Sequence, residues 1–245
     1  MSDVDSNPAG WPPENTVFPV ASAIVTVSDE RHPFDLRERA RAAENWEREI
    51  AANPALFDGR MVLQHRVRIA EGVVESRAHL VPFSTFLWWR RTKPAGAAYH
   101  LFALPVILSS DGAVIAIRMA RTTANPGRVY CAAGSLDAND IVDGVCDLDA
   151  NMVREVAEET GLDLRAATAE PGFHGVHVQS AITLFRRFRF AETADVLVAR
   201  IAAHIATDPE PEIDEAIAIR DADPGRHTYA TFMPPILAWV FREAP

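Results

Sequence analysis

The segment from residue 152 to residue 162 constrains the fold more than any other stretch of the chain. It reads Met-Val-Arg-Glu-Val-Ala-Glu-Glu-Thr-Gly-Leu. Asp147 or Asp149 can accept hydrogen bonds from the free amides at a helix start, and Gly161 can adopt the left-handed conformation that ends a helix. The segment therefore predicts a helix of about three turns, with an apolar stripe that can pack on a neighbouring element.

Three glutamates of this predicted helix share one face. Glu155, Glu158 and Glu159 stand at positions i, i+3 and i+4, and side chains at those spacings are neighbours on a helix surface. Three carboxylates this close repel one another unless a cation lies between them. Because hard oxygen ligands suit Mg²⁺ and Mn²⁺, the glutamates predict a divalent metal site. The alternative is a solvated acidic face with no ligand.

The same segment resembles half of a known motif. From Arg154 to Leu162 it matches every fixed position in the second half of the Nudix box, G-x5-E-x7-R-E-U-x-E-E-x-G-U, in which U is aliphatic. The resemblance implies an α/β fold, a Nudix-type α/β/α sandwich with a mixed β-sheet. It also implies metal-dependent hydrolysis of a nucleoside diphosphate linked to another moiety, with Arg154 orienting one of the box carboxylates.

The first half of the motif does not align without a gap. A gapless count back from Arg154 places Asp140 where the family has glycine and Cys146 where it has its first glutamate. Aligning Gly134 with the motif glycine resembles the family better, since an expected strand ends there. Under that alignment Gly134 joins the three glutamates as a metal ligand that the resemblance implies.

Alignment on Gly134 requires an insertion of 6 residues between Asp137 and Asp149. The first glutamate of the motif is then missing, and either Asp143 or Asp147 is a candidate to replace it. The number of metal ions bound depends on which acid, if any, fills this role.

The chain divides into three parts by composition. Residues 1–15 are rich in Pro, Gly, Asp and Ser and predict a flexible tail without the basic and apolar pattern of a signal peptide. Residues 16–98 predict an N-terminal α+β extension, and residues 99–245 the Nudix hydrolase domain. The expected elements of the extension are strands at 17–27, 61–70 and 72–81 and an amphipathic helix at 35–52.

The extension carries a resemblance of its own. Trp46, Asn53-Pro54, Phe57 and Gly59 are similar to the N-terminal extension of the Nudix branch that includes UDP-glucose and UDP-galactose pyrophosphatases. This resemblance implies a UDP-sugar substrate. The alternative is that these residues serve packing and turns.

In the C-terminal part, Asp111-Gly112 between two apolar runs predicts a β-hairpin. The other expected elements, read from their hydrophobic patterns, are strands at 181–190 and 195–203 and a closing helix at 228–241.

Four side chains are candidates for substrate binding. Arg118, Arg121 and Arg128 lie at or just beyond the predicted hairpin, and a guanidinium fork matches phosphate oxygens. Trp88, which is followed by Trp89 and two arginines, can stack on a base or a sugar. The alternatives are solvation for each arginine and burial for at least one tryptophan.

A downstream acidic loop offers a further catalytic group. Many Nudix enzymes place an additional metal ligand or general base on such a loop, and the resemblance implies this role for Glu212 or Glu215. His174 and His177 flank a glycine and are candidates for loop bases or ligands, although isolated histidines more often serve structure.

Charge and composition exclude other classes of protein. A net charge of −10 disfavours a nucleic-acid backbone binder, which needs clustered positive charge. No run approaches the roughly 18 apolar residues that span a bilayer, and two cysteines without a metal-binding spacing fit a reducing cytoplasm. The expected partner is a small nucleotide substrate, and homodimerisation stays open. The alternatives to an enzyme are a nucleotide-binding or regulatory Nudix module without turnover, and a structural domain.

Overall fold

The computed structural model describes residues 10–242. Its larger β-sheet has eight strands, with the central order β1-β11-β12-β5-β6-β13, while β10 pairs with β12 and β7 with β6. The sheet is mixed, because β12 runs parallel to β5 and the other pairs are antiparallel. The strands are β1 Phe18–Val20, β5 His100–Leu108, β6 Val114–Met119, β7 Val129–Tyr130, β10 Thr168–Ala169, β11 Phe173–Val178, β12 Ala181–Arg189 and β13 Ile213–Ile219.

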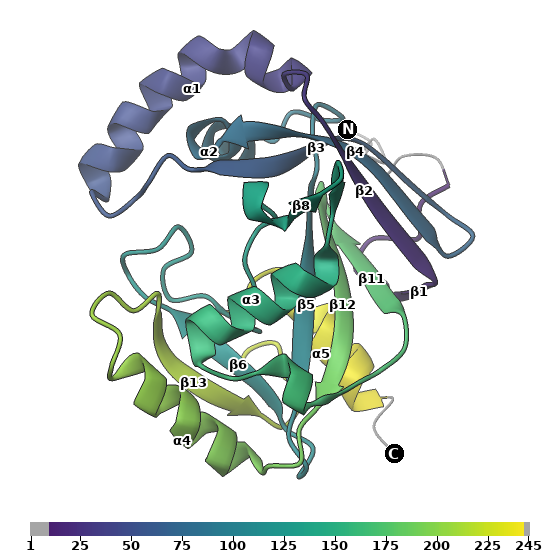
Figure 1. The fold of residues 1–245 in the computed structure, drawn as a ribbon, viewed down its shortest axis with the longest axis vertical. Helices are drawn as coiled ribbons and strands as arrows, with labels where there is room; N and C mark the ends of the chain where they lie inside the picture. The colour runs from purple at the N-terminus through teal and green to yellow at the C-terminus, as the bar shows by residue number, and fades with distance from the viewer. Residues whose placement is uncertain (1–9, 243–245) are drawn as a thin grey trace.

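Helices cover both faces of this sheet, so the predicted α/β sandwich with a mixed sheet is confirmed (Figure 1). Helices α3 (Leu148–Thr160) and α4 (Ala194–Ile205) lie on one face, and α5 (Met233–Arg242) lies on the other. The ring of Trp239 in α5 lies 5.4 Å from that of Phe185 in β12. The apolar stripe of each helix is buried against the sheet. This burial of hydrophobic side chains between helix and sheet stabilises the architecture.

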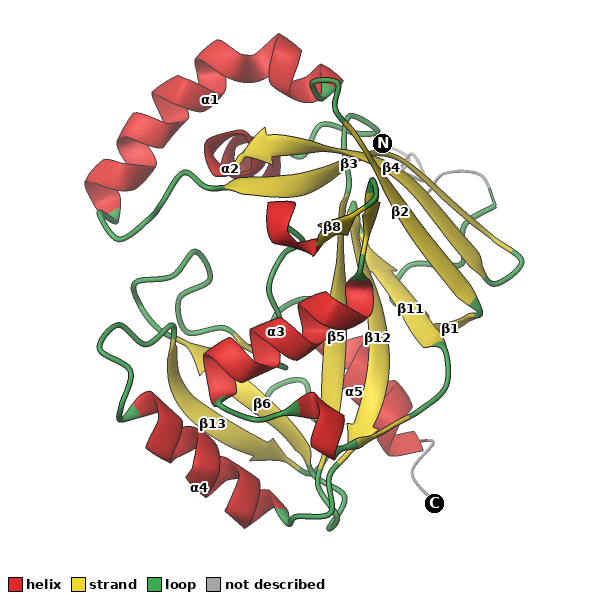
Figure 2. Ribbon diagram, in the orientation of Figure 1, coloured by secondary structure: helices red, strands yellow, loops and turns green. Residues whose placement is uncertain are grey.

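A smaller, five-stranded sheet forms most of the N-terminal part, in the order β3-β4-β2-β9-β8 (Figure 2). Helices α1 and α2 accompany it, and their facing residues form a separate small core. The elements are β2 Ser22–Ser28, β3 Arg60–Ala70, β4 Val73–Pro82, β8 Ile141–Val142, β9 Val145–Cys146, α1 Pro33–Ala52 and α2 Phe83–Thr92, and two short 3₁₀ helices, η1 Ala138–Asp140 and η2 Leu164–Ala166, complete the described chain.

The two sheets exchange strands. The predicted strand at 17–27 is two strands, of which β1 pairs with β11 in the larger sheet and β2 pairs with β4 in the smaller one. In the other direction, the insertion predicted between Asp137 and Asp149 forms η1 and the β8–β9 hairpin, and Val145 pairs with Thr26 of β2. A simple boundary between residues 98 and 99 therefore does not separate the two sheets.

The strand predicted at 195–203 is wrong, because this segment is helix α4. Val and Ile content suggested a strand, yet the buried side chains Ala194, Leu197 and Ile201 recur at the helical spacing. The amide of Ala194 at the helix start donates to Oδ1 of Asp111, 2.8 Å away, in the β5–β6 turn. A cap supplied by so distant a residue is not visible in the local sequence.

Part of the predicted flexible tail is anchored. The ring of Trp11 lies 5.4 Å from that of Tyr99 and 5.2 Å from that of His177. Nε2 of His177 lies 2.7 Å from the carbonyl oxygen of Pro12. The segment 10–15 is thus packed on the larger sheet, His177 serves that packing, and residues 1–9 lie outside the described part of the chain.

The motif resemblance of the extension falls on packing and turn residues. The ring of Trp46 lies 6.4 Å from that of Phe83 in α2, at a nearly perpendicular angle. Asn53 ends α1, and its Nδ2 donates to the carbonyl oxygen of Thr122 at 2.8 Å.

Within residues 10–242, no helix is long and apolar enough to cross a membrane.

A buried histidine at the start of α1 gives the fold an acid-sensitive point. Nδ1 of His32 accepts from the amide of Phe34 at 3.0 Å, among the rings of His65 and His79. Burial lowers the pKa of His32 to about 4. The unfolded imidazole binds a proton near pH 6.5 and the folded one only near pH 4, so stability falls as the pH falls through that window.

We expect His32 to cost the wild type about 2 to 3 kcal/mol of unfolding free energy between pH 6.5 and pH 4. The measurement is urea denaturation at several pH values for the wild type and His32→Asn, since asparagine keeps a capping acceptor. The variant should lose less stability than the wild type over this range. Parallel curves for the two proteins would contradict the prediction.

Candidate active site

The predicted helix bearing the three glutamates is α3. Its cap is Asp147, whose Oδ1 accepts from the amide of Ala150 at 2.9 Å, and Gly161 ends it with φ of 67°. Met152 and Val156 are buried under the helix. This packing leaves the glutamate face of α3 toward the loops that lie between the two sheets.

Arg154 is the centre of a group of acidic side chains. Its Nη1 lies 2.8 Å from Oε1 of Glu155 and 3.1 Å from Oε2 of Glu158, and its Nη2 lies 3.0 Å from Oδ1 of Asp140. One guanidinium therefore holds two of the three glutamates predicted as metal ligands in fixed directions. Glu159 is the glutamate of the set that it does not pair with.

The buried acid opposite Arg154 is Asp140, which the sequence analysis did not propose. Besides Arg154, the Oδ2 of Asp140 accepts from Nδ2 of Asn151 at 3.0 Å and from the amide of Asp137 at 2.9 Å. In the gapless count its position aligns with the motif glycine, which predicts no role for a side chain there. The signal that could have found it is its place just before the inserted hairpin, within reach of the helix start.

The two acids proposed to replace the motif glutamate lie elsewhere. Asp143 stands at the turn of the β8–β9 hairpin with φ of 49°. Asp147 uses its carboxylate to cap α3. Neither carboxylate pairs with Arg154. The carboxylate contacts that Arg154 makes outside its own helix are with Asp140 of η1 and with Asp137, which caps η1.

Glu155 and Glu159 are carboxylates in an environment that disfavours their charge. Burial raises the pKa of Glu155 to about 7. Burial, with the nearby charges of Glu155 and Glu212, raises the pKa of Glu159 well above its usual value. Oε2 of Glu159 is buried and has no hydrogen-bond partner within the described chain. A buried carboxylate that lacks a counter-charge, as Glu159 does, fits a site that binds a cation.

The same side chains do not form a closed metal cage. Within residues 10–242, no three His, Cys, Asp or Glu side chains are arranged to hold one ion. Mg²⁺ does not require such a cage, because it keeps several waters and binds through one or two carboxylates plus substrate phosphates. The orphaned oxygen of Glu159 and the neighbouring Glu155 fit that kind of site.

Gly134 lies against Glu155. A Cβ atom at position 134 would collide with the carboxylate of Glu155. Since that carboxylate is the end of a flexible side chain, it can turn away, at the cost of its ion pair with Arg154. We therefore expect Gly134→Ala to lower the turnover of the hydrolysis that the Nudix resemblance implies roughly 10- to 100-fold by misplacing Glu155, while the unfolding free energy falls by about 1 to 3 kcal/mol.

The turnover rate and the unfolding free energy from urea denaturation are measured on the same preparations of the wild type and Gly134→Ala. Gly225→Ala is a matched control, because it is exposed and a Cβ there meets Asp223 only at an ordinary 3.4 Å. Equal activity of Gly134→Ala and the wild type would show that the contact with Glu155 has no functional role.

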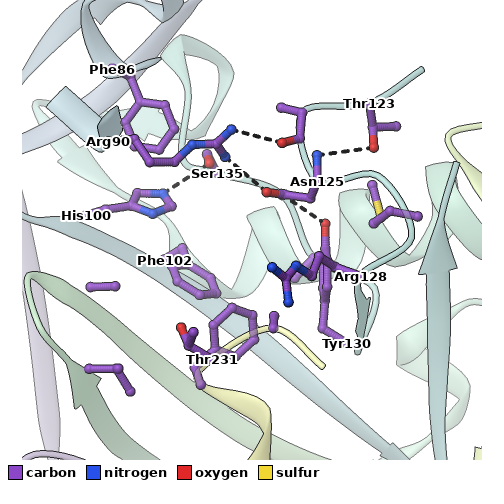
Figure 3. Close-up of a pocket in the computed structure, with 18 of the residues that line it drawn as sticks. Phe86, Arg90, His100, Phe102, Thr123, Asn125, Arg128, Tyr130, Ser135 and Thr231 are labelled. Carbon is purple, nitrogen blue, oxygen red and sulfur yellow. Dashed lines mark hydrogen bonds between the residues drawn. The ribbon is translucent and has the colours of Figure 1, made fainter. Parts of the chain in front are cut away.

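A cavity of 420 Å³ adjoins the glutamates, and Figure 3 shows the aromatic and polar part of its wall. Glu155, Glu159 and Glu212 lie on one part of its wall, with Gly134 beside them. The remaining wall is aromatic and polar and includes Phe86, Arg90, His100, Phe102, Asn125, Arg128, Tyr130, Ser135, Thr231 and Phe232. Such a combination of rings, hydrogen-bonding groups and ionisable groups is typical of a small-molecule site.

The aromatic side chains form a continuous series along the cavity. The ring of Phe102 lies 5.1 Å from that of Phe232 and 5.0 Å from that of His100, and His100 lies 4.8 Å from Phe86. Burial lowers the pKa of His100 to about 3, so its imidazole is neutral at physiological pH. Nε2 of His100 lies 3.1 Å from Oγ of Ser135.

Of the three predicted phosphate-binding arginines, Arg128 lines the cavity. Its Nη1 donates to the carbonyl oxygen of Tyr229 at 3.3 Å. Arg118 instead forms a 2.7 Å ion pair with Glu215 and is not part of the wall, and Arg121 is exposed and also lies outside it. Glu215 is thus engaged by Arg118, while Glu212 of the two downstream acids faces the cavity.

The tryptophan that lines the cavity is Trp89 and not the predicted Trp88. Nε1 of Trp88 donates to Oε2 of Glu38 in α1 at 3.3 Å, so its ring faces the other helix. Successive residues of a helix point about 100° apart, which is why the two neighbours serve different surfaces. Arg90, which follows them, lines the cavity as well.

The chain has only low sequence identity to the known proteins that it resembles. No protein-family model matches the chain, and no curated protein matches it. Among solved structures it resembles the MutT protein from Methanosarcina mazei Go1, with 17% identity over 59% of this chain and 94% of that chain and a TM-score of 0.40. It also resembles the Nudix hydrolase RenU from M. smegmatis, with 12% identity over 59% and 83% and a TM-score of 0.37.

A third solved structure, the E. coli ORF135 protein, is 15% identical over 61% of this chain and 93% of that chain, with a TM-score of 0.36. The likeness is one of fold.

Proposed function

We propose that the protein hydrolyses a nucleoside diphosphate linked to another moiety, in a reaction that depends on Mg²⁺ or Mn²⁺. The observation that carries this proposal is the cavity in which Glu155 and Glu159 face aromatic rings and two arginines. Rings can stack on a base, and guanidinium groups can bind phosphate oxygens. The acidic part of the same wall is where a cation would bring the phosphates and the carboxylates together.

Attack on a diphosphate requires neutralised phosphate charge and an oriented water molecule. Glu155 and Glu159 on the cavity wall, with the backbone of Gly134, would hold the metal ion, and Glu158 lies beside them on α3. A bound ion supplies charge neutralisation and a more acidic water. Arg154 keeps Glu155 and Glu158 in place through its ion pairs. Glu212, which faces the cavity, is the candidate to orient water or accept its proton.

A second function is binding without turnover. It is favoured by the ion pairs that occupy Glu155 and Glu158 and by Cys146, which is buried where the gapless motif has a glutamate. In that case the protein would take up a nucleotide in the cavity and release it unchanged. The two functions make opposite predictions for product formation and the same prediction for binding.

The test is phosphate release, with a coupled phosphatase, from a panel of substrates with Mg²⁺ or Mn²⁺. The panel contains UDP-sugars, ADP-ribose, NADH, dinucleoside polyphosphates and nucleoside triphosphates. Within it we propose UDP-sugars first, on the resemblance of the extension. Metal-dependent turnover of one class would support the hydrolase, whereas binding without product across the panel would select the binding module.

A further inference from the structure

Arg90 brings a positive charge from the N-terminal part of the chain to the cavity. It lies on α2, and its guanidinium reaches across to the loop between β6 and β7 (Figure 3). Nη1 donates to Oδ1 of Asn125 at 3.0 Å, and Nη2 donates to the carbonyl oxygen of Ala124 at 2.9 Å. The guanidinium also lies 5.8 Å from the centre of the Phe86 ring.

The charge of Arg90 is not neutralised by a carboxylate. Between residues 10 and 242, no aspartate or glutamate forms an ion pair with it, and both of its acceptors are neutral. The nearby Glu49 is engaged by Arg91 at 3.6 Å. Burial lowers the pKa of Arg90, which shows that its surroundings disfavour the cation. A partly buried cation with neutral partners gains from an incoming anion.

The remaining wall of the cavity limits what that anion can be. Glu155 and Glu159 repel an anion unless a metal ion accompanies it, and the aromatic series from Phe86 to Phe232 requires an apolar or planar portion in the same molecule. A phosphate group attached to a ring-bearing moiety satisfies both conditions. Phosphate oxygens also match the planar fork of a guanidinium.

We propose that Arg90 binds a phosphate oxygen of the substrate, so that the N-terminal part of the chain supplies a substrate-binding residue. The identity of the ligand rests on the function proposed above. Arg90 acts here as a binding residue that determines affinity. The glutamates of α3, which lie on another part of the wall, are not involved in this contact.

The competing explanation is that Arg90 only ties α2 to the 121–128 loop. A second tie to the same loop allows this to be tested, because Nδ2 of Asn53 donates to the carbonyl oxygen of Thr122 at 2.8 Å. Asn53→Ala removes that tie without removing charge from the cavity. Arg91→Gln removes the adjacent charge of α2, which is exposed and points away from the cavity wall.

The experiment is calorimetric titration of the full chain, in the presence of Mg²⁺, by ADP, GDP, CDP and UDP and by the nucleoside of whichever diphosphate binds most tightly. For Arg90→Gln we expect the Kd of that diphosphate to rise about 10-fold or more, with little change for the nucleoside. The Kd of the diphosphate for Arg90→Lys should lie between those for the wild type and for Arg90→Gln. Asn53→Ala and Arg91→Gln should bind like the wild type, and all variants should have similar melting temperatures.

The other possible results decide separately on the role of Arg90 and on the proposed hydrolysis. Equal loss of affinity in Asn53→Ala and Arg90→Gln would show that the loop tie is what matters. An unchanged Kd in Arg90→Gln, or no binding of any diphosphate to the wild type, would overturn the inference even if hydrolysis is observed. Conversely, Arg90-dependent binding in a protein without turnover would uphold the inference and reject the hydrolase. With an active wild type, KM should rise in Arg90→Gln while kcat changes little.

Discussion

Glu159→Gln is expected to lower metal-dependent turnover by about 10²- to 10³-fold and to raise the unfolding free energy of the metal-free protein by about 1 kcal/mol. The loss of activity follows from removing a carboxylate that faces the cavity. The gain in stability follows because Oε2 of Glu159 is buried without a partner, near Glu155 and Glu212. An uncharged amide of the same shape removes that repulsion.

Both effects are measured on the same preparations, as kcat with Mg²⁺ and as urea denaturation in the presence of a chelator. Glu47→Gln is the matched control, because Glu47 is exposed on α1 far from the cavity wall. It should change neither quantity. A Glu159→Gln variant that keeps full activity would remove the main support for the acidic wall as the catalytic site.

Asp140→Asn is expected to lower the unfolding free energy by about 4 kcal/mol, because it breaks a buried ion pair on one side only. Asp140 is buried and accepts from Arg154, from Asn151 and from the amide of Asp137. Its replacement removes the most deeply buried counter-charge of the guanidinium, leaving those of Glu155 and Glu158, and places new donors beside existing ones. Turnover should fall as well, since Arg154 also positions Glu155.

Urea denaturation of Asp140→Asn and Asp143→Asn tests this prediction. Asp143 lies at the exposed hairpin turn with positive φ, a conformation that asparagine tolerates, so its replacement should cost less than about 0.5 kcal/mol. If the two variants have the same stability, Asp140 is not the acid that fixes Arg154.

Elements with local signals were predictable from the sequence. Helix α3 has its cap, its apolar stripe and its terminal glycine within a few residues of one another, and the β5–β6 hairpin has Asp111-Gly112 at its turn. Helix α4 was missed because its cap comes from Asp111, a partner that only the folded chain brings near. Local patterns cannot report contacts of that kind.

The candidate site likewise contains some residues that local sequence patterns predict and others that only the folded chain brings together. The glutamates follow from helical spacing, but the wall opposite them depends on how α2 is rotated against α1 and the β6–β7 loop. That rotation directs Trp88 to Glu38 and brings Trp89 and Arg90 to the cavity. Likewise, Arg118 was a reasonable phosphate ligand until the register of β6 and β13 placed Glu215 beside it.

The exchange of strands between the two sheets has a consequence for synthesis on the ribosome. Phe18 of β1 pairs with Gly175 of β11, and Thr26 of β2 pairs with Val145 of β9. The first strands of the chain therefore wait for most of the polypeptide to emerge before their hydrogen bonds can be completed. Pairing across so long a stretch is slow and leaves strand edges open meanwhile. The nascent chain is therefore most prone to edge-to-edge aggregation during that interval.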